Sequence, residues 1–386
     1  MTPTSPAAAP ADTLTKWQPT WSPDQTDPGL PPITLITDPH DQAAYITTAL
    51  AAHNPALGRI AVHPTPLATA PAYLAHDLIR ALGKHLPPPD ADPPWWTGNA
   101  DESWRVAVAW TKALGISHYV ICRAHRITGR HLEHLVALRE HTRIRLTLVV
   151  SGPTPAALAT ILNTVSHRHI GTLEGARRHL ETDQQPTSTI PARYGWWHPA
   201  PFPAPHDEPR YELPPRPRHP AARPRDTVNS RRAPAQLPAG CTPSTAIALP
   251  ALTHSEHPST CHETVAQRIH SRIAHPVHAA AVAIRVLAGY DIDQLSQITI
   301  PTPQRPRADL PADLPEWVLP LQDAARIYTE LQGHIRTDLP AHLSGTHKPF
   351  RLATWERDDV ARATETCRLV EAPTRKRPNT PRKSRP

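Results

Sequence analysis

The sequence predicts an α/β fold with a doubly wound parallel sheet, followed by a proline-rich linker and a smaller all-helical domain. Three observations lead to this class. Short apolar strands alternate with amphipathic helices between residues 33 and 182, which is typical of parallel sheets. Residues 183–240 hold 14 prolines and eight arginines, a composition that favours an extended chain. From about residue 260, helical periodicity replaces the alternation.

The α/β domain is expected over residues 33–182. Its first strand covers Ile33–Thr37, and Asp38 is positioned to cap the next helix, with Pro39 at the first helical position and the end near His53. Further strands are expected over 59–63, 119–122 and 145–150, with a short one near Ile170. Further helices are expected over 70–82, 101–114, 129–141, 155–166 and 173–180.

Four other parts flank this domain. Residues 1–32 are expected to be a disordered N-terminal segment, with Trp17 and Trp21 available for docking. The linker extends over 183–259, and a helical domain covers 260–372. Residues 373–386 form a basic disordered tail. Helices of the helical domain are expected over 261–273, 276–287, from 292, over 320–334 and over 355–369.

Composition bears on the compartment and on the partners. Four scattered cysteines and the lack of an apolar signal segment predict reduced thiols and a cytoplasmic protein. No apolar stretch approaches the roughly 18 residues of a membrane span, so we expect no membrane partner. The net charge of +7 suggests nucleic acid as a partner. However, the tail alone has six Lys and Arg and no acid, so it carries most of that excess.

The most informative segment is Tyr119–His125, in which a buried strand runs into Cys122-Arg123-Ala124-His125. This order matches a Walker B box of the D-E-A-H type, with a thiol and a guanidinium in place of its two acids. A Walker B aspartate holds magnesium and the following glutamate orients the attacking water. Neither replacement can perform these tasks.

The block from Ile33 to Leu180 resembles the nucleotide-binding domain of AAA-type P-loop ATPases, most closely the transposition-helper and secretion ATPases. The resemblance rests on the first strand followed directly by a helix, on the altered Walker B box, and on Leu146–Gly152, which looks like the sensor strand. It implies a P-loop NTPase-like sheet. The alternative is another flavodoxin-like or Rossmann-like α/β domain.

The phosphate loop that this family requires is missing. Glycines let backbone N–H groups surround the phosphates, and a lysine meets the terminal ones. No glycine lies between Leu30 and Leu57, and no Lys or Arg between Trp17 and Gly58. The turn after the first strand instead carries Asp38, His40 and Asp41. Two carboxylates would repel a triphosphate by on the order of 1 to 4 kcal/mol for each close contact.

We therefore expect no catalytic residue, no cofactor and no metal, and a degenerate cleft at Asp38, His40, Asp41, Cys122, Arg123 and His125. Arg123 has two interpretations. It forms a salt bridge with Asp38 or Asp41 across the former nucleotide cleft, or it is a solvated residue at a strand end.

Other motifs leave alternatives open. Cys241, His254, His257, Cys261 and His262 contain zinc-ligand types, but their spacing matches no closed finger, so a flexible linker end is preferred. Residues 278–298 contain a turn at Gly289 and have two interpretations, a helix-turn-helix or a packing hairpin.

The paired tryptophans at 95–96 and 196–197 also have two interpretations: they anchor a partner or pack on their own domain. The tail residues that could bind phosphates are Arg375, Lys376, Arg377, Arg382, Lys383 and Arg385.

The expected function is that of a non-catalytic AAA-like adaptor or regulator with a protein partner, associated with DNA or a mobile element. One alternative is a DNA-binding protein that acts through the helical domain and the basic tail. Another is an ATP-binding protein with a non-standard nucleotide site that uses Arg123, His125 or His40.

Overall fold

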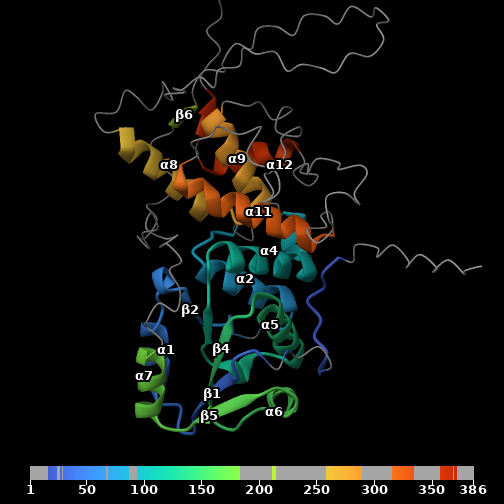
Figure 1. Cartoon of the computed structure of the whole chain (residues 1–386), viewed down its shortest axis with the longest axis vertical. Helices are drawn as coiled ribbons and strands as arrows, with labels where there is room; N and C mark the ends of the chain where they lie inside the picture. Colours follow the sequence, from blue (N-terminus) through green and yellow to red (C-terminus); the bar gives the residue numbers. More distant parts are fainter. Residues whose placement is uncertain are drawn as a thin grey trace, which may run out of the picture.

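The computed structural model describes residues 16–23, 27, 29–66, 68–86, 94–182, 211–213, 258–288, 315–333, 357–367 and 369–371. Its centre is a five-stranded sheet in the order β2-β3-β4-β1-β5 (Figure 1). Every neighbouring pair in this sheet is parallel. The predicted α/β class with a parallel sheet is therefore confirmed.

The strands are short and fall where the apolar runs predicted them. They are β1 Ile33–Asp38, β2 Arg59–Val62, β3 His118–Ile121, β4 Arg145–Ser151 and β5 His167–Ile170. Strands β1, β2, β3 and β4 are buried almost throughout, as expected when helices cover both faces of a parallel sheet. The edge strand β5 is mostly exposed.

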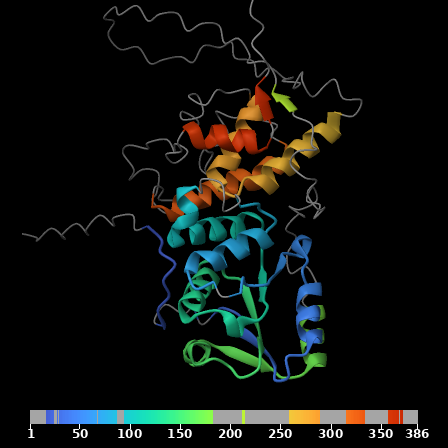
Figure 2. The same cartoon turned by 180° about the vertical axis from the view of Figure 1, so that it is seen from behind.

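Helices lie on both sides of the sheet (Figures 1 and 2). Helices α1 Ala43–Ala51 and α7 Leu173–Thr182 contact each other and cover one face. The other face packs against α2 Pro71–Ala81, α4 Ala100–Ala113, α5 Gly129–Thr142 and α6 Ala156–Leu162. A short helix, α3 Trp95–Gly98, precedes α4. The sheet is therefore doubly wound.

The first helix begins later than the sequence predicted. Asp38 does not cap it, because Asp38 is the last residue of β1 and its Oδ1 accepts a hydrogen bond from the backbone N–H of His40 (3.2 Å). Helix α1 starts at Ala43 after Gln42, whose side chain makes no capping bond. Four residues thus separate the strand from the helix, and they form the turn that carries His40 and Asp41.

The C-terminal helices pack on the α/β part above α2 and α4 (Figure 1). They are α8 Pro258–Arg272, α9 Pro276–Ala288, α11 Leu319–Leu331 and α12 Arg357–Thr366. Their buried side chains belong to the same hydrophobic core as those of α2 and α4. Several hydrogen bonds cross the seam; among them, Trp110 Nε1 donates to Ala274 O (2.6 Å) and Lys84 Nζ donates to His270 O (2.7 Å).

Helix α9 is buried on every side from Val277 to Val286. Its alanines allow α11 and α12 to approach closely, so it serves as the centre of the helical layer. Of residues 278–298, the structure describes 278–288, which belong to α9. The turn at Gly289 and the helix expected from 292 lie outside the described residues.

Two further features depart from the sequence prediction, and the first tryptophan pair follows one of its two alternatives in part. Strand β6 Tyr211–Leu213 lies within the expected linker and pairs in parallel with β7 Leu369–Glu371. Residues 16–23, expected to be disordered, lie against the core instead. Trp96 is buried on its own domain, while Trp95 is 57% exposed. The pair at 196–197 and the basic tail lie outside the described residues.

Within the described part of the chain, no helix combines the length and the apolar character that crossing a bilayer requires.

Candidate functional site

The predicted site residues meet at the carboxyl ends of β1, β3 and β4. In open parallel sheets, ligands bind beyond the carboxyl ends of the strands where the strand order reverses. Here the chain leaves β1 for the far edge strand β2, whereas after β4 it passes to β5 on the other side of β1. The reversal lies at β1 and β4, and Asp38 and Ser151 are register partners at their ends. We call the residues gathered there the strand-end site: Asp38, His40, Asp41, Cys122, Arg123, His125 and Ser151.

Arg123 and Asp41 connect the two predicted halves of this site. Arg123 follows β3, and its guanidinium lies 3.6 Å from the Asp41 carboxylate in the turn after β1. The two side chains are 24% and 57% exposed, so water screens the pair and its contribution to stability is small. Of the two interpretations of Arg123, the salt bridge with Asp41 is the one that the structure shows.

Both partners of this ion pair adopt the left-handed backbone conformation. Asp41 has φ 49° and Arg123 has φ 50°. Residues other than glycine rarely adopt this region, and such conformations gather at functional sites and switch segments. The ion pair therefore joins two turns that share the same unusual backbone conformation.

His125 binds the end of β4. It lies in a 3₁₀ turn, Ala124–Arg126, and its Nδ1 accepts a hydrogen bond from the backbone N–H of Ser151 (3.0 Å). Burial lowers the pKa of His125, Arg126 and Arg123 lower it further, and Asp41 opposes them. The ring is therefore neutral at pH 7, with its proton on Nε2.

Asp38 is the most buried acid of the site. Its side chain is fully buried, and its Oδ2 has no hydrogen-bond partner among the described residues. The backbone carbonyl of Asp38 accepts a hydrogen bond from Gly152 N–H (2.8 Å). The Ser151 hydroxyl, buried on the neighbouring strand, likewise has no partner in the described part of the chain. His40, in contrast, is exposed.

Cys122 follows β3 and is the site residue whose side chain is a thiol. It is fully buried in the core beneath α1 and α7. Burial raises the pKa of its thiol to about 11, although the nearby Arg123 acts in the opposite direction. The thiol therefore stays protonated at neutral pH, and thiolate is the form that binds metals and attacks electrophiles.

No metal centre is formed by the described residues, where no three His, Cys, Asp or Glu side chains gather. Three of the zinc-ligand types noted in the sequence, Cys241, His254 and His257, lie outside the described residues. Cys261 and His262 fall within α8, but their side chains are outside the described set.

The site has no arrangement of a nucleophile with a base, and its charges are opposite to those of a nucleotide site. Carboxylates follow β1, where phosphates would need N–H groups and a lysine. A cation follows β3, where magnesium would need an acid. Sequence reasoning identified both halves but missed Ser151 as a member. Its position as the polar residue that ends the apolar β4 strand was the available signal.

Comparisons of the chain with protein-family models, with curated proteins and with solved structures gave no match. The function therefore has to be argued from this geometry.

Proposed function

We propose that the chain is a non-catalytic adaptor or regulatory protein built on an α/β domain of the AAA type. The observation that carries this proposal is the Arg123–Asp41 ion pair (3.6 Å), which connects the two turns between which a nucleotide would bind. An ATPase needs these turns apart and complementary to phosphate and magnesium. In this chain the two turns instead carry opposite charges, on Arg123 and Asp41, that attract each other.

The strand order supports the choice of fold family. The order β2-β3-β4-β1-β5 differs from the Rossmann order 3-2-1-4-5-6 and from the flavodoxin order 2-1-3-4-5. It places β4 between β1 and β3, as expected of an AAA-type P-loop core. This argues against the flavodoxin-like and Rossmann-like alternatives.

The chemistry of the strand-end site supports the absence of catalysis. The thiol of Cys122 is protonated and buried, so it offers no magnesium ligand. Asp38 and Asp41 would repel the phosphates that a phosphate loop attracts. His125 could still act as a hydrogen-bond donor through Nε2, but its Nδ1 already accepts a bond from the end of β4.

A thermal-melting titration with magnesium-ATP tests the proposal. A ligand at a hundredfold excess over its Kd stabilises the folded state by about 2.7 kcal/mol. We expect no rise of Tm with magnesium-ATP, magnesium-ADP or magnesium-GTP up to millimolar concentration. The proposal is abandoned if Tm rises with ligand concentration in the wild-type chain.

Two variants show which site is responsible if a rise occurs. Arg123→Ala removes the guanidinium of the strand-end site, and Arg126→Ala removes an exposed arginine three residues away. A rise that Arg123→Ala abolishes and Arg126→Ala preserves would establish the non-standard nucleotide site. A rise that both variants preserve would place the nucleotide elsewhere.

A further inference from the structure

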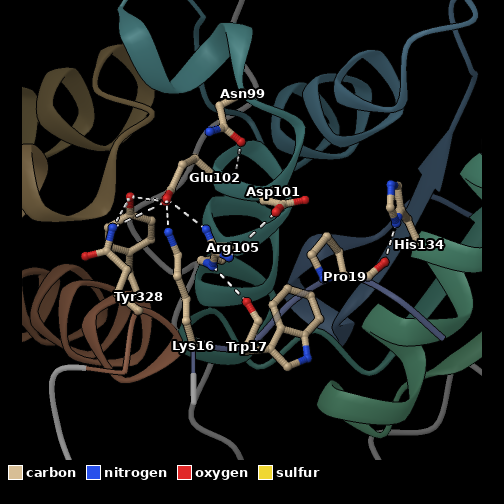
Figure 3. Close-up of polar contacts among 10 residues, drawn as sticks. Lys16, Trp17, Pro19, Asn99, Asp101, Glu102, Arg105, His134 and Tyr328 are labelled. Atoms are coloured by element: carbon tan, nitrogen blue, oxygen red, sulfur yellow. Dashed lines mark hydrogen bonds and ion pairs between the residues drawn. The ribbon is translucent and has the colours of Figure 1, made fainter. Parts of the chain in front are cut away.

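Residues 16–23, which we call the N-terminal strap, lie extended across α4, α5 and the C-terminal end of α11 (Figures 1 and 3). Residues 16–22 of the strap belong to no helix and to no strand of the sheet. Within it, burial alternates along Lys16–Trp21: Trp17, Pro19 and Trp21 face the protein, whereas Lys16, Gln18 and Thr20 are exposed. Such alternation is typical of an extended peptide seated on a surface.

The backbone of the strap is recognised by groups from three helices. The N–H of Trp17 donates to Leu331 O at the end of α11 (2.9 Å). The carbonyl of Trp17 accepts a hydrogen bond from Arg105 Nε of α4 (2.9 Å), and the carbonyl of Pro19 accepts one from His134 Nδ1 of α5. Proline has no N–H, so no donor of Pro19 is left unpaired. Recognition of backbone groups from outside, with alternate side chains inward, is how peptide-binding domains hold their ligands.

The side chains of the strap have matching contacts. The Trp17 ring packs against His141 of α5, with ring centroids 5.3 Å apart. Both Trp17 and Trp21 pack against the main core. Lys16 Nζ lies 2.8 Å from Glu102 Oε1, but the lysine side chain is 47% exposed. The inward tryptophan rings are thus packed against the protein, and Lys16 adds a screened charge contact.

The surface beneath the strap also has contacts that the strap does not supply. Arg105 is 1% exposed and pairs with Glu102 at 2.8 Å on its own helix. Glu102 in turn accepts hydrogen bonds from Tyr328 (2.8 Å) and Gln332 (3.3 Å) of α11. Asn99 caps α4 through the N–H of Glu102, which holds this carboxylate at a helix N-terminus, where negative charge is favoured. The strap thus lies on a surface whose own residues are hydrogen-bonded to one another.

We propose that the N-terminal strap is a detachable ligand in cis, and that the groove between α4, α5 and α11 is a binding site for an extended peptide of the pattern Trp-x-Pro-x-Trp. The occupant is residues 17–21 of this chain, Trp-Gln-Pro-Thr-Trp. The site lies on the side of the sheet opposite α1 and α7 (Figure 1), and the proposal does not depend on the strand-end site.

A labelled peptide of residues 14–23 tests the proposal by fluorescence anisotropy. The full chain carrying Trp17→Ala and Trp21→Ala has an open groove, and the wild-type chain has an occupied one. Because an internal occupant lowers the apparent affinity by the fraction of open grooves, we expect the variant to bind at least about tenfold more tightly than the wild-type chain. A folded variant that does not bind the peptide overturns the proposal.

Two control peptides test the predicted pattern. A peptide with Gln18→Ala and Thr20→Ala changes only outward residues and should bind like the original. A peptide with Trp17→Ala and Trp21→Ala should lose binding. Equal binding of both control peptides would mean that affinity does not depend on the two tryptophans, and the proposed pattern would be rejected.

A second measurement applies if the double variant fails to fold. A protease site introduced between Pro23 and Asp27 of the otherwise wild-type chain allows the strap to be cut after folding. We expect the cut fragment to stay bound during gel filtration and to be replaced by an excess of the labelled peptide. If the peptide cannot replace the fragment, or if the cut chain unfolds, the strap is a fixed part of the core and the proposal fails.

Discussion

The hydroxyl of Tyr328 donates a hydrogen bond to Glu102 Oε2 at 2.8 Å, which connects α11 to α4 through a carboxylate that is almost completely buried. Burial alone would raise the pKa of Glu102. Lys16, Tyr328 and Arg105 outweigh that effect, and the pKa lies below its usual value. Glu102 is therefore charged at neutral pH, and its carboxylate joins the strap, α4 and α11.

Replacing Tyr328 by Phe should weaken the contact between the two helices. Hydrogen bonds to charged groups contribute about 1.5 to 3 kcal/mol, so we expect Tyr328→Phe to lower the free energy of unfolding by about 2 kcal/mol in urea. Tyr45→Phe is the matched control, since the Tyr45 hydroxyl makes only a long bond of 3.4 Å to Gly171 O. Equal losses in the two variants would show that the hydrogen bond to Glu102 contributes no more to the free energy of unfolding than the long bond of Tyr45.

His141 should make the stability of the protein depend on pH. Burial, with a smaller effect of Lys112, lowers the pKa of His141 to about 4. The folded state thus keeps this ring neutral while the unfolded chain binds a proton near pH 6.5. Its contribution to stability is complete above pH 6.5 and is lost as the pH falls toward 4.

The expected size of this effect is about 2 kcal/mol between pH 7 and pH 5. We therefore expect the loss of unfolding free energy over this range to be smaller in His141→Gln than in the wild-type chain by about that amount. His40→Gln changes an exposed histidine and should keep the wild-type loss. If His141→Gln and the wild-type chain lose the same unfolding free energy, the pKa of His141 does not differ between the folded and unfolded states.

The left-handed backbone of Arg123 can be separated from its ion pair by comparing two substitutions. Arg123→Ala and Arg123→Gly both remove the contact with Asp41, but only glycine adopts φ 50° without steric cost. Left-handed geometry costs other residues roughly 1 to 2 kcal/mol. We expect Arg123→Gly to be more stable than Arg123→Ala by about 1 kcal/mol in urea unfolding. An alanine variant as stable as the glycine variant would show that the turn relaxes.

Introducing an acid at residue 122 should not create a nucleotide site. A carboxylate at this fully buried position loses its hydration, and we expect Cys122→Asp to cost about 3 kcal/mol or more. Because the phosphate loop is also missing, magnesium-ATP should still leave the Tm of this variant unchanged. Cys122→Ser is the control for polarity without charge and should cost less. A Cys122→Asp chain that is stabilised by magnesium-ATP would indicate an intact nucleotide site that lacks a single residue.

The sequence by itself determined the local elements and the class of the fold. Periodicity depends on neighbours a few residues apart, so the strands at 33–38 and 145–151 and the helix at 129–142 lie within a few residues of their predicted bounds. The same reasoning placed carboxylates after the first strand and a cation after the third. It was wrong about the first helix because Asp38, a good cap in isolation, uses its oxygen in the turn.

The tertiary structure alone decided which of these pieces meet. Strand order, the 3.6 Å contact between Arg123 and Asp41, and the seating of Trp17 between α5 and α11 join residues far apart in the chain. No local pattern encodes such contacts, since their free energy comes from burial and from partners supplied by other elements. The strap shows this most clearly: by composition residues 1–32 cannot fold alone, and residues 16–23 are ordered only because three helices supply the surface and the hydrogen-bond partners.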